Sequence, residues 1–253
     1  MKNKLNFQTP KNFSKLVEDN ELFSHYSKTN YPYYYDLNFI QLHFNPTKEE
    51  FVLLEEILKE YQHAEGQNHL KFYWPENTGL FIEVLEYLSV NSYELGKLEL
   101  LHVSPNQFTQ TSSNSNVSLH KVSLDSLESF IALNYQDDLA FGKEFALNKC
   151  DFYREQFQLP DVSFWLAFIE DEPVGALILV SSEHFLEVDN LLTAASWRKQ
   201  GIASELLAYV VKMAAQQEKE VILLADAEDT PREMYLKQGF EVMGSQIHVL
   251  KEL

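Results

Sequence analysis

The stretch Arg198–Ala203 reads Arg-Lys-Gln-Gly-Ile-Ala and lies between a predicted strand and a predicted helix. Apolar and β-branched residues predict the strand at Phe185–Thr193, and apolar residues recur at helical spacing in 201–220. At such a junction, the unpaired N–H groups of the first helical turn and the helix dipole attract an anion. Gly201 allows a diphosphate to approach the backbone closely, and Arg198 adds a positive charge beside it. The stretch therefore predicts an anion site, although many α/β proteins carry such a glycine without binding phosphate.

A second motif follows the first along the chain. It consists of an apolar strand at Val221–Ala225, a short helix starting at Pro231 that contains Tyr235, and then Gly239-Phe240. Asp229 or Thr230 is the expected N-cap of that helix. Together the two motifs resemble those of the GNAT superfamily of N-acetyltransferases, whose signature is Arg/Gln-x-x-Gly-x-Gly/Ala. The resemblance covers roughly residues 117–253. It implies acetyl-CoA as the donor and a primary amine as the acceptor, attacked directly without an acyl-enzyme.

The resemblance also implies which residues hold the coenzyme. The diphosphate is expected at Arg198 and at the N–H groups of the first helical turn, and the pantetheine arm is expected along the end of the preceding strand. Members often carry an asparagine seven residues before the tyrosine, and this chain departs from them with Glu228. The expected coenzyme-binding residues are Leu191, Leu192, Thr193, Arg198, Lys199, Gly201, Ile202, Ala203 and Ser204.

Two residues are expected to take part in catalysis. Tyr235 aligns with the tyrosine that many members use to protonate the coenzyme thiolate, and a phenol with a pKa of about 10 can donate a proton at neutral pH. The alternative for Tyr235 is a core aromatic. Glu187 corresponds to the glutamate base of histone-acetylating members, with a solvated strand carboxylate as the alternative. The alternation of strand side chains puts Glu187, Asp189 and Leu191 on one face.

Composition narrows the classes of partner. The formal net charge of −18 argues against nucleic acid, because phosphate binding needs clustered Lys and Arg. No stretch has the length and hydropathy of a membrane span or a signal peptide, so we expect a cytoplasmic protein that does not bind membranes. The single Cys150 cannot form an internal disulfide, and the histidines lack metal-ligand spacing, so no metal is expected.

The pattern predicts an α/β (α+β) chain in three parts. Residues 117–253 should adopt the GNAT fold, a mixed central sheet flanked by helices. The expected order of elements is strand, two helices, three strands, helix, strand, helix, strand. Residues 1–104 predict a smaller, divergent GNAT-like α/β domain without the phosphate motif, with a short helix at Lys11–Leu22 and a capping box at Thr47–Glu50. The polar residues 105–116 predict a linker.

Two classes of function stay open at this point. The first is an N-acetyltransferase whose acceptor is a small-molecule or peptide amine. The second is a non-catalytic acetyl-CoA-binding sensor or interaction scaffold with the GNAT fold. A homodimer is compatible with both, since GNAT proteins often dimerise.

Overall fold

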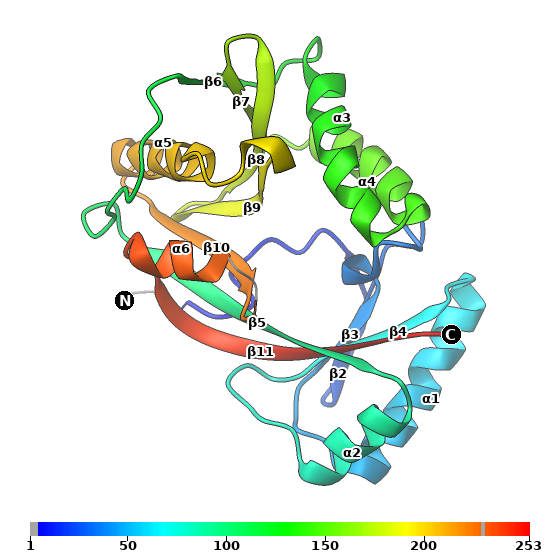
Figure 1. Cartoon of the computed structure of the whole chain (residues 1–253). Coiled ribbons are helices and arrows are strands. Elements are labelled where there is room, and N and C mark those ends of the chain that lie inside the picture. The colour runs from blue at the N-terminus through cyan, green and yellow to red at the C-terminus, as the bar shows by residue number, and fades with distance from the viewer. Residues whose placement is uncertain (1–4, 229–230) are drawn as a thin grey trace. The chain divides into compact units, whose positions relative to one another are not determined.

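The computed structural model describes residues 5–228 and 231–253 (Figure 1). The chain divides into two compact units. Unit 1 consists of the described part of Met1–Glu99 together with Asp226–Glu228 and Met243–Leu253, and unit 2 consists of Leu100–Ala225 and the described part of Asp229–Val242. No helix in the described ranges is long and apolar enough to cross a membrane.

Unit 1 is a sheet with two helices on one face. The strand order is β1-β2-β3-β4-β11, in which β3 and β4 are parallel and the other pairs are antiparallel. Apolar side chains of α1 and α2 pack on this sheet around the fully buried Phe51, Phe72 and Trp74. The elements are β1 (Lys15–Asp19), β2 (Phe23–Ser27), η1 (Tyr35–Leu37), β3 (Phe39–Leu42), α1 (Lys48–Glu65), β4 (His69–Tyr73), α2 (Ile82–Val90), β5 (Glu94–Val103), which continues into unit 2, and β11 (Glu241–Glu252).

The start of α1 confirms the predicted capping box. The Thr47 hydroxyl accepts a hydrogen bond from the Glu50 N–H, and the Glu50 carboxylate accepts one from the Thr47 N–H at 2.8 Å. Both bonds satisfy N–H groups that a helix start leaves without intrahelical partners.

Replacing the capping threonine should destabilise the protein measurably. We expect Thr47→Ala to lower the free energy of unfolding by about 1 kcal/mol, because the Glu50 N–H loses its acceptor. Urea denaturation followed by circular dichroism measures the change. Thr47→Ser keeps the hydroxyl and should stay close to the wild type, so an equal loss in both variants would contradict the role of the cap.

Two features of unit 1 differ from the sequence predictions. The helix predicted at Lys11–Leu22 is wrong, because this segment contains β1, whose residues pair with β2 from Lys15↔Ser27 to Asp19↔Ser24. That pairing partner lies outside the segment, so local propensity could not indicate it. The chain's last residues, Met243–Leu253, belong to unit 1 rather than to the domain predicted at 117–253, because β11 pairs with β4 from His248↔Tyr73 to Glu252↔His69.

Unit 2 contains a second run of neighbouring strands, in the order β10-β9-β8-β7-β6. β9 and β10 are parallel, and β6 to β9 form antiparallel pairs. The elements follow the order predicted from the sequence. They are β6 (Val117–Lys121), α3 (Leu127–Asp138), η2 (Leu139–Phe141), α4 (Lys143–Gln156), β7 (Val162–Ile169), β8 (Glu172–Ser181), β9 (Phe185–Thr193), η3 (Ala195–Trp197), α5 (Ile202–Gln216), β10 (Glu220–Asp226) and α6 (Pro231–Lys237).

Helices cover both faces of the unit 2 sheet (Figure 1). α5 packs its buried leucines and valines against β8, β9 and β10. On the other face, Phe130 of α3 and Tyr153 of α4 contact Phe164 of β7. Gly175 lets α5 approach β8 closely, because a Cβ there would lie 2.8 Å from the Ile202 side chain. The mixed sheet flanked by helices that the sequence predicted is therefore present, and it fixes where α5 begins.

Candidate functional site

A β-bulge interrupts β9 near its middle. Ile178 of β8 pairs with Asn190 and Leu179 pairs with Val188, so Asp189 is an extra residue without a partner on β8. Val188 lies in the core beneath α5, and Leu191 packs against the same core. Without the bulge, two-residue alternation would bring Leu192 to that face instead. The bulge thus reverses the alternation of side chains in the second half of the strand.

β9 and β10 stop pairing at the same bulge. Their parallel register ends at Leu223↔Val188, although β9 continues to Thr193 and β10 to Asp226. The Ala194 N–H donates to the Val174 carbonyl next to β8, at 2.9 Å. Alternation then directs the Leu192 N–H towards β8 and the N–H groups of Leu191 and Thr193 towards the unpaired edge. Of the three strand residues predicted to hold pantetheine, two therefore offer an amide at that edge.

The turn between β9 and α5 contains several backbone N–H groups, at residues 199–204, that have no hydrogen-bond acceptor in the part of the chain that the structure describes. Gly201 has φ +85° and Lys199 has φ +62°, a left-handed conformation that is uncommon for a residue with a side chain. Among the described residues, no acceptor bonds to the N–H groups of 199–204. Successive amides in such a turn converge and form a concavity that suits an anion. These unpaired amides are compatible with a diphosphate at this turn, and the coenzyme site stays a prediction.

Arg198 has a different local role from the one predicted. Its Nη2 lies 2.7 Å from Asp137 Oδ1 of α3, and its Nε donates to the Thr193 carbonyl at 3.3 Å. The guanidinium therefore connects the end of α3 to the end of β9. The guanidinium stays more than half exposed beside the unpaired amides, and its contact with an anion stays a prediction.

The other predicted coenzyme residues form the first turn of α5. The Ile202 side chain is buried in the unit 2 core, and Ala203 is half-buried. The Ser204 hydroxyl is buried and accepts a hydrogen bond from Gln238 Nε2 at 2.7 Å. These side chains fix the helix start, so their amides are the groups that face the turn.

Tyr235 lies on α6 and is 7% exposed. Its ring packs edge-on against Phe240, with the ring centroids 5.6 Å apart, within the same core as α5. Pro231 opens α6 as predicted. The predicted N-cap, Asp229 or Thr230, lies outside the described residues. The structure thus shows Tyr235 as a core aromatic, and a proton-donating role remains a prediction.

The bulge separates the two carboxylates of β9. Glu187 is buried and pairs with Ile222 of β10, where the two strands are still joined. Asp189 lies where the strands part, and it is exposed as a residue although the surrounding protein desolvates its carboxyl. The prediction that Glu187, Asp189 and Leu191 share a face is wrong for Leu191, because the bulge moves that residue to the α5 side. Sequence reasoning missed Asp189 as a candidate, and no local sequence signal marks the bulge.

Helix α4 holds the Asp189 side chain. Gln156 Nε2 donates to Asp189 Oδ2 at 3.1 Å, and the adjacent Asn190 donates to Asn134 of α3 at 2.7 Å. Burial raises the pKa of the Asp189 carboxyl above its ordinary value, although the charge of Lys149 and the Gln156 bond act in the opposite direction. A carboxylate with a raised pKa is a stronger base than an ordinary carboxylate.

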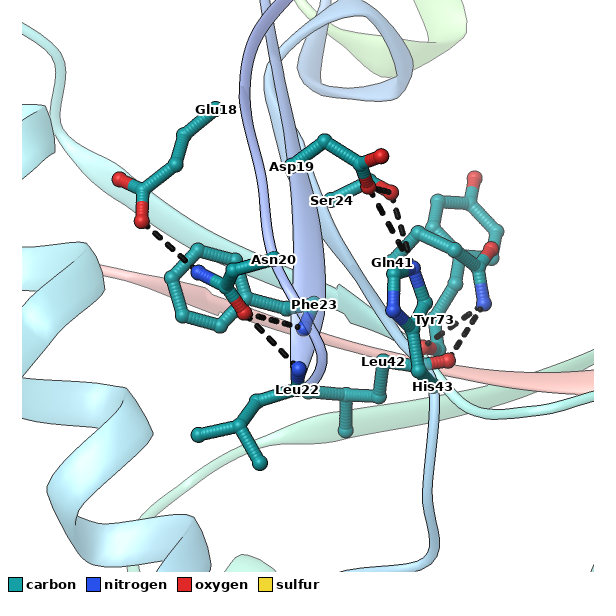
Figure 2. A network of polar contacts seen from close by, with 10 residues as sticks. All are labelled: Glu18, Asp19, Asn20, Leu22, Phe23, Ser24, Gln41, Leu42, His43 and Tyr73. Carbon is teal, nitrogen blue, oxygen red and sulfur yellow. Dashed lines mark hydrogen bonds and ion pairs between the residues drawn. The ribbon is translucent and has the colours of Figure 1, made fainter.

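Unit 1 contains a serine, a histidine and an aspartate in contact (Figure 2). Ser24 Oγ lies 2.9 Å from His43 Nε2 and donates to Asp19 Oδ1 at 2.6 Å. Asp19 approaches the same ring nitrogen, at 3.9 Å. In a catalytic triad the carboxylate binds the other ring nitrogen and orients the imidazole. The arrangement is therefore unlike a hydrolase triad. Its hydrogen bonds connect the end of β1, the start of β2 and the residue after β3.

Comparison with protein families gives two matches. Residues 131–249 match the model described as "Acetyltransferase (GNAT) domain", and residues 5–101 match "Domain of unknown function (DUF5613)". No curated protein matches the chain. Residues 131–249 therefore match the GNAT acetyltransferase family, as the two sequence motifs predicted.

Similar solved structures cover nearly the whole chain. A functionally unknown conserved protein from Staphylococcus epidermidis ATCC 12228 is 26% identical, with a TM-score of 0.91 over 98% of both chains. A GCN5-related N-acetyltransferase from Kribbella flavida is 17% identical, with a TM-score of 0.62 over 94% of this chain and 89% of the other. A tandem GNAT protein from the clavulanic acid biosynthesis pathway is 8% identical, with a TM-score of 0.52 over 84% of this chain and 74% of the other. The fold is that of the GNAT proteins, and the tandem relative agrees with a divergent GNAT-like first half.

Proposed function

We propose that this protein is an N-acetyltransferase that transfers the acetyl group of acetyl-CoA to a primary amine. One observation carries the proposal: the unpaired amides of 199–204 lie at the end of a strand that has just parted from its parallel neighbour. This combination fits a coenzyme with a diphosphate and a long amide-containing arm. The GNAT fold of unit 2 supports the same donor.

The residues present suit both parts of the coenzyme. The amides from Lys199 to Ser204 would bind the diphosphate, and the N–H groups of Leu191 and Thr193 would bind the pantetheine arm. The coenzyme supplies an activated thioester. An N–H at the parted end of β9 would stabilise the oxyanion that forms when a nitrogen attacks that thioester.

Asp189 is the residue that we assign to the acceptor. An amine attacks only when it is neutral, so its proton needs a nearby base. Asp189 is an exposed residue at the bulge, and its carboxylate is held by Gln156 through Oδ2. It would attract the ammonium form of the acceptor and then take its proton. The identity of the acceptor, a small molecule or a peptide, is left to a substrate screen.

Tyr235 would give its phenolic proton to the departing thiolate, and the second proton that the attacking nitrogen loses as the amide forms would restore the phenol. We expect Tyr235→Phe to lower turnover about tenfold or more, since the phenol supplies the proton, and to leave the dissociation constant for acetyl-CoA nearly unchanged. Thiol release measures turnover and calorimetry measures affinity. Phe240→Leu is the matched control, because it disturbs the same ring contact without removing a hydroxyl. Turnover in Tyr235→Phe equal to that of the wild type would remove Tyr235 as the acid.

The alternative is a sensor that binds acetyl-CoA without transferring its acetyl group. Both functions need the same diphosphate turn, so coenzyme affinity does not separate them. Thiol release in the presence of a panel of amines does. Micromolar binding of acetyl-CoA without transfer to diamines, aminoglycosides, lysine peptides or peptide N-termini would favour the sensor.

A further inference from the structure

The predicted linker, residues 105–116, is hydrogen-bonded to both coenzyme motifs of unit 2. It contains no helix or strand, yet the Thr109 N–H donates to the Gln238 carbonyl at 2.9 Å, and Gln238 Nε2 lies 3.4 Å from Thr111 Oγ1. A Cβ on Gly239 would lie 2.4 Å from the Gln107 carbonyl oxygen. This end of the segment is therefore fixed against the end of α6.

The other end of the segment contacts the diphosphate turn. Asn114 Nδ2 donates to the Gln200 carbonyl at 3.0 Å, and the Asn114 N–H donates to Glu205 Oε1 at 2.7 Å. Atoms of Ser112, Ser113 and Asn114 lie 3.5–3.6 Å from the position of a Cβ on Gly201. Three residues of the segment thus pack on the glycine of the motif, while the amides of the turn stay unpaired.

These contacts remove two groups that oppose an anion. The Gln200 carbonyl is a partial negative charge within the turn, and Glu205 puts a full negative charge on the first turn of α5. Either would repel a diphosphate if it pointed towards the amides. Asn114 donates a hydrogen bond to both of them. It therefore holds the turn so that its N–H groups face the ligand and its oxygens do not.

We propose that Asn114 is a positioning residue for the coenzyme, acting through Gln200 and Glu205 without catalysing a step itself. The inference rests on the proposed function, since it concerns how the same site accepts a diphosphate. It extends the coenzyme site beyond the two sequence motifs into the segment predicted to be a linker.

Asn114→Asp tests this role sharply. The variant keeps the side-chain oxygen that accepts a hydrogen bond from the Asn116 N–H, so the local turn of the segment persists. It loses the donor to the Gln200 carbonyl and puts a carboxylate near Glu205. We expect the dissociation constant for acetyl-CoA to rise about tenfold by calorimetry, with turnover unchanged at saturating acetyl-CoA.

Two further variants separate positioning from charge and folding. Asn116→Asp makes the same chemical change two residues along, at an exposed position, and should bind acetyl-CoA as the wild type does. Adding Glu205→Gln to Asn114→Asp removes the repulsion and should restore most of the affinity. Hydrogen exchange without coenzyme should show faster exchange of amides 199–205 in Asn114→Asp than in Asn116→Asp.

The binding results separate the role of Asn114 from the proposed acetyltransferase function. If the wild type binds acetyl-CoA and Asn114→Asp binds it equally well, Asn114 has no positioning role while the proposed function stands. If Asn114→Asp and Asn116→Asp weaken binding equally, the effect is general charge and the inference fails. If the wild type does not bind acetyl-CoA, the proposed function is overturned and the inference with it.

Discussion

Gly201→Glu should abolish the binding of acetyl-CoA. The new side chain would start next to Ser112, Ser113 and Asn114, displace them from the turn, and add a negative charge beside the unpaired amides, so we expect the dissociation constant to rise about a hundredfold or more. Calorimetric titration of acetyl-CoA into the wild type and the variant measures the change.

The control for this variant must separate charge at the turn from backbone strain. Gly201 has a positive φ, so any side chain there is strained. Gly142 also has a positive φ, +106°, with open space around the position of a Cβ, and it precedes α4 in the same unit. Gly142→Glu should bind acetyl-CoA with wild-type affinity. An equal loss in both variants would point to unfolding and contradict a diphosphate site at Gly201.

Asp189→Asn should lower turnover about a hundredfold at neutral pH, because the amide cannot accept the proton of the amine. The pH profile carries the sharper test. A protonated carboxyl cannot act as a base, so the wild-type rate should rise with pH through the pKa of Asp189, which burial holds above the ordinary value of about 4. This rise should disappear in Asp189→Asn, and steady-state rates from pH 4 to about 9 would show it.

Two other carboxylates serve as controls for Asp189. Asp138 also has a pKa raised by burial and lies near Lys149, but it accepts a hydrogen bond from Tyr153 at 3.0 Å. Asp138→Asn should keep the pH profile of the wild type. Glu187→Gln tests the base predicted from the sequence. If that variant loses the rise with pH while Asp189→Asn keeps it, the base is Glu187.

Local patterns in the sequence are sufficient to predict most of the helices and strands of unit 2. The strand at Phe185–Thr193 and the order of helices and strands were predicted correctly, because apolar periodicity and the Gly201 turn are local signals. The predicted diphosphate turn also has the expected unpaired amides.

The parts that the sequence did not predict depend on distant partners. The bulge at Asp189 arises from how β9 pairs with β8, so the sequence of β9 alone gives regular alternation and the wrong face for Leu191. The sequence predicts Arg198 as a phosphate ligand, but it does not predict the ion pair of Arg198 with Asp137 on α3. β1 likewise depends on its pairing with β2 and was taken for a helix. Such contacts form only when the chain folds.

The place of β11 in unit 1 has a consequence for protein synthesis. β4 is synthesised early, but its antiparallel neighbour within Met243–Leu253 is synthesised only after the whole of unit 2. An N-terminal domain commonly finishes folding while the rest of the chain is still being made. Unit 1 cannot do so, because its sheet needs Met243–Leu253. An emerging chain must keep this edge of β4 unpaired until Met243–Leu253 has left the ribosome, so the first unit completes its sheet only after unit 2 has been synthesised.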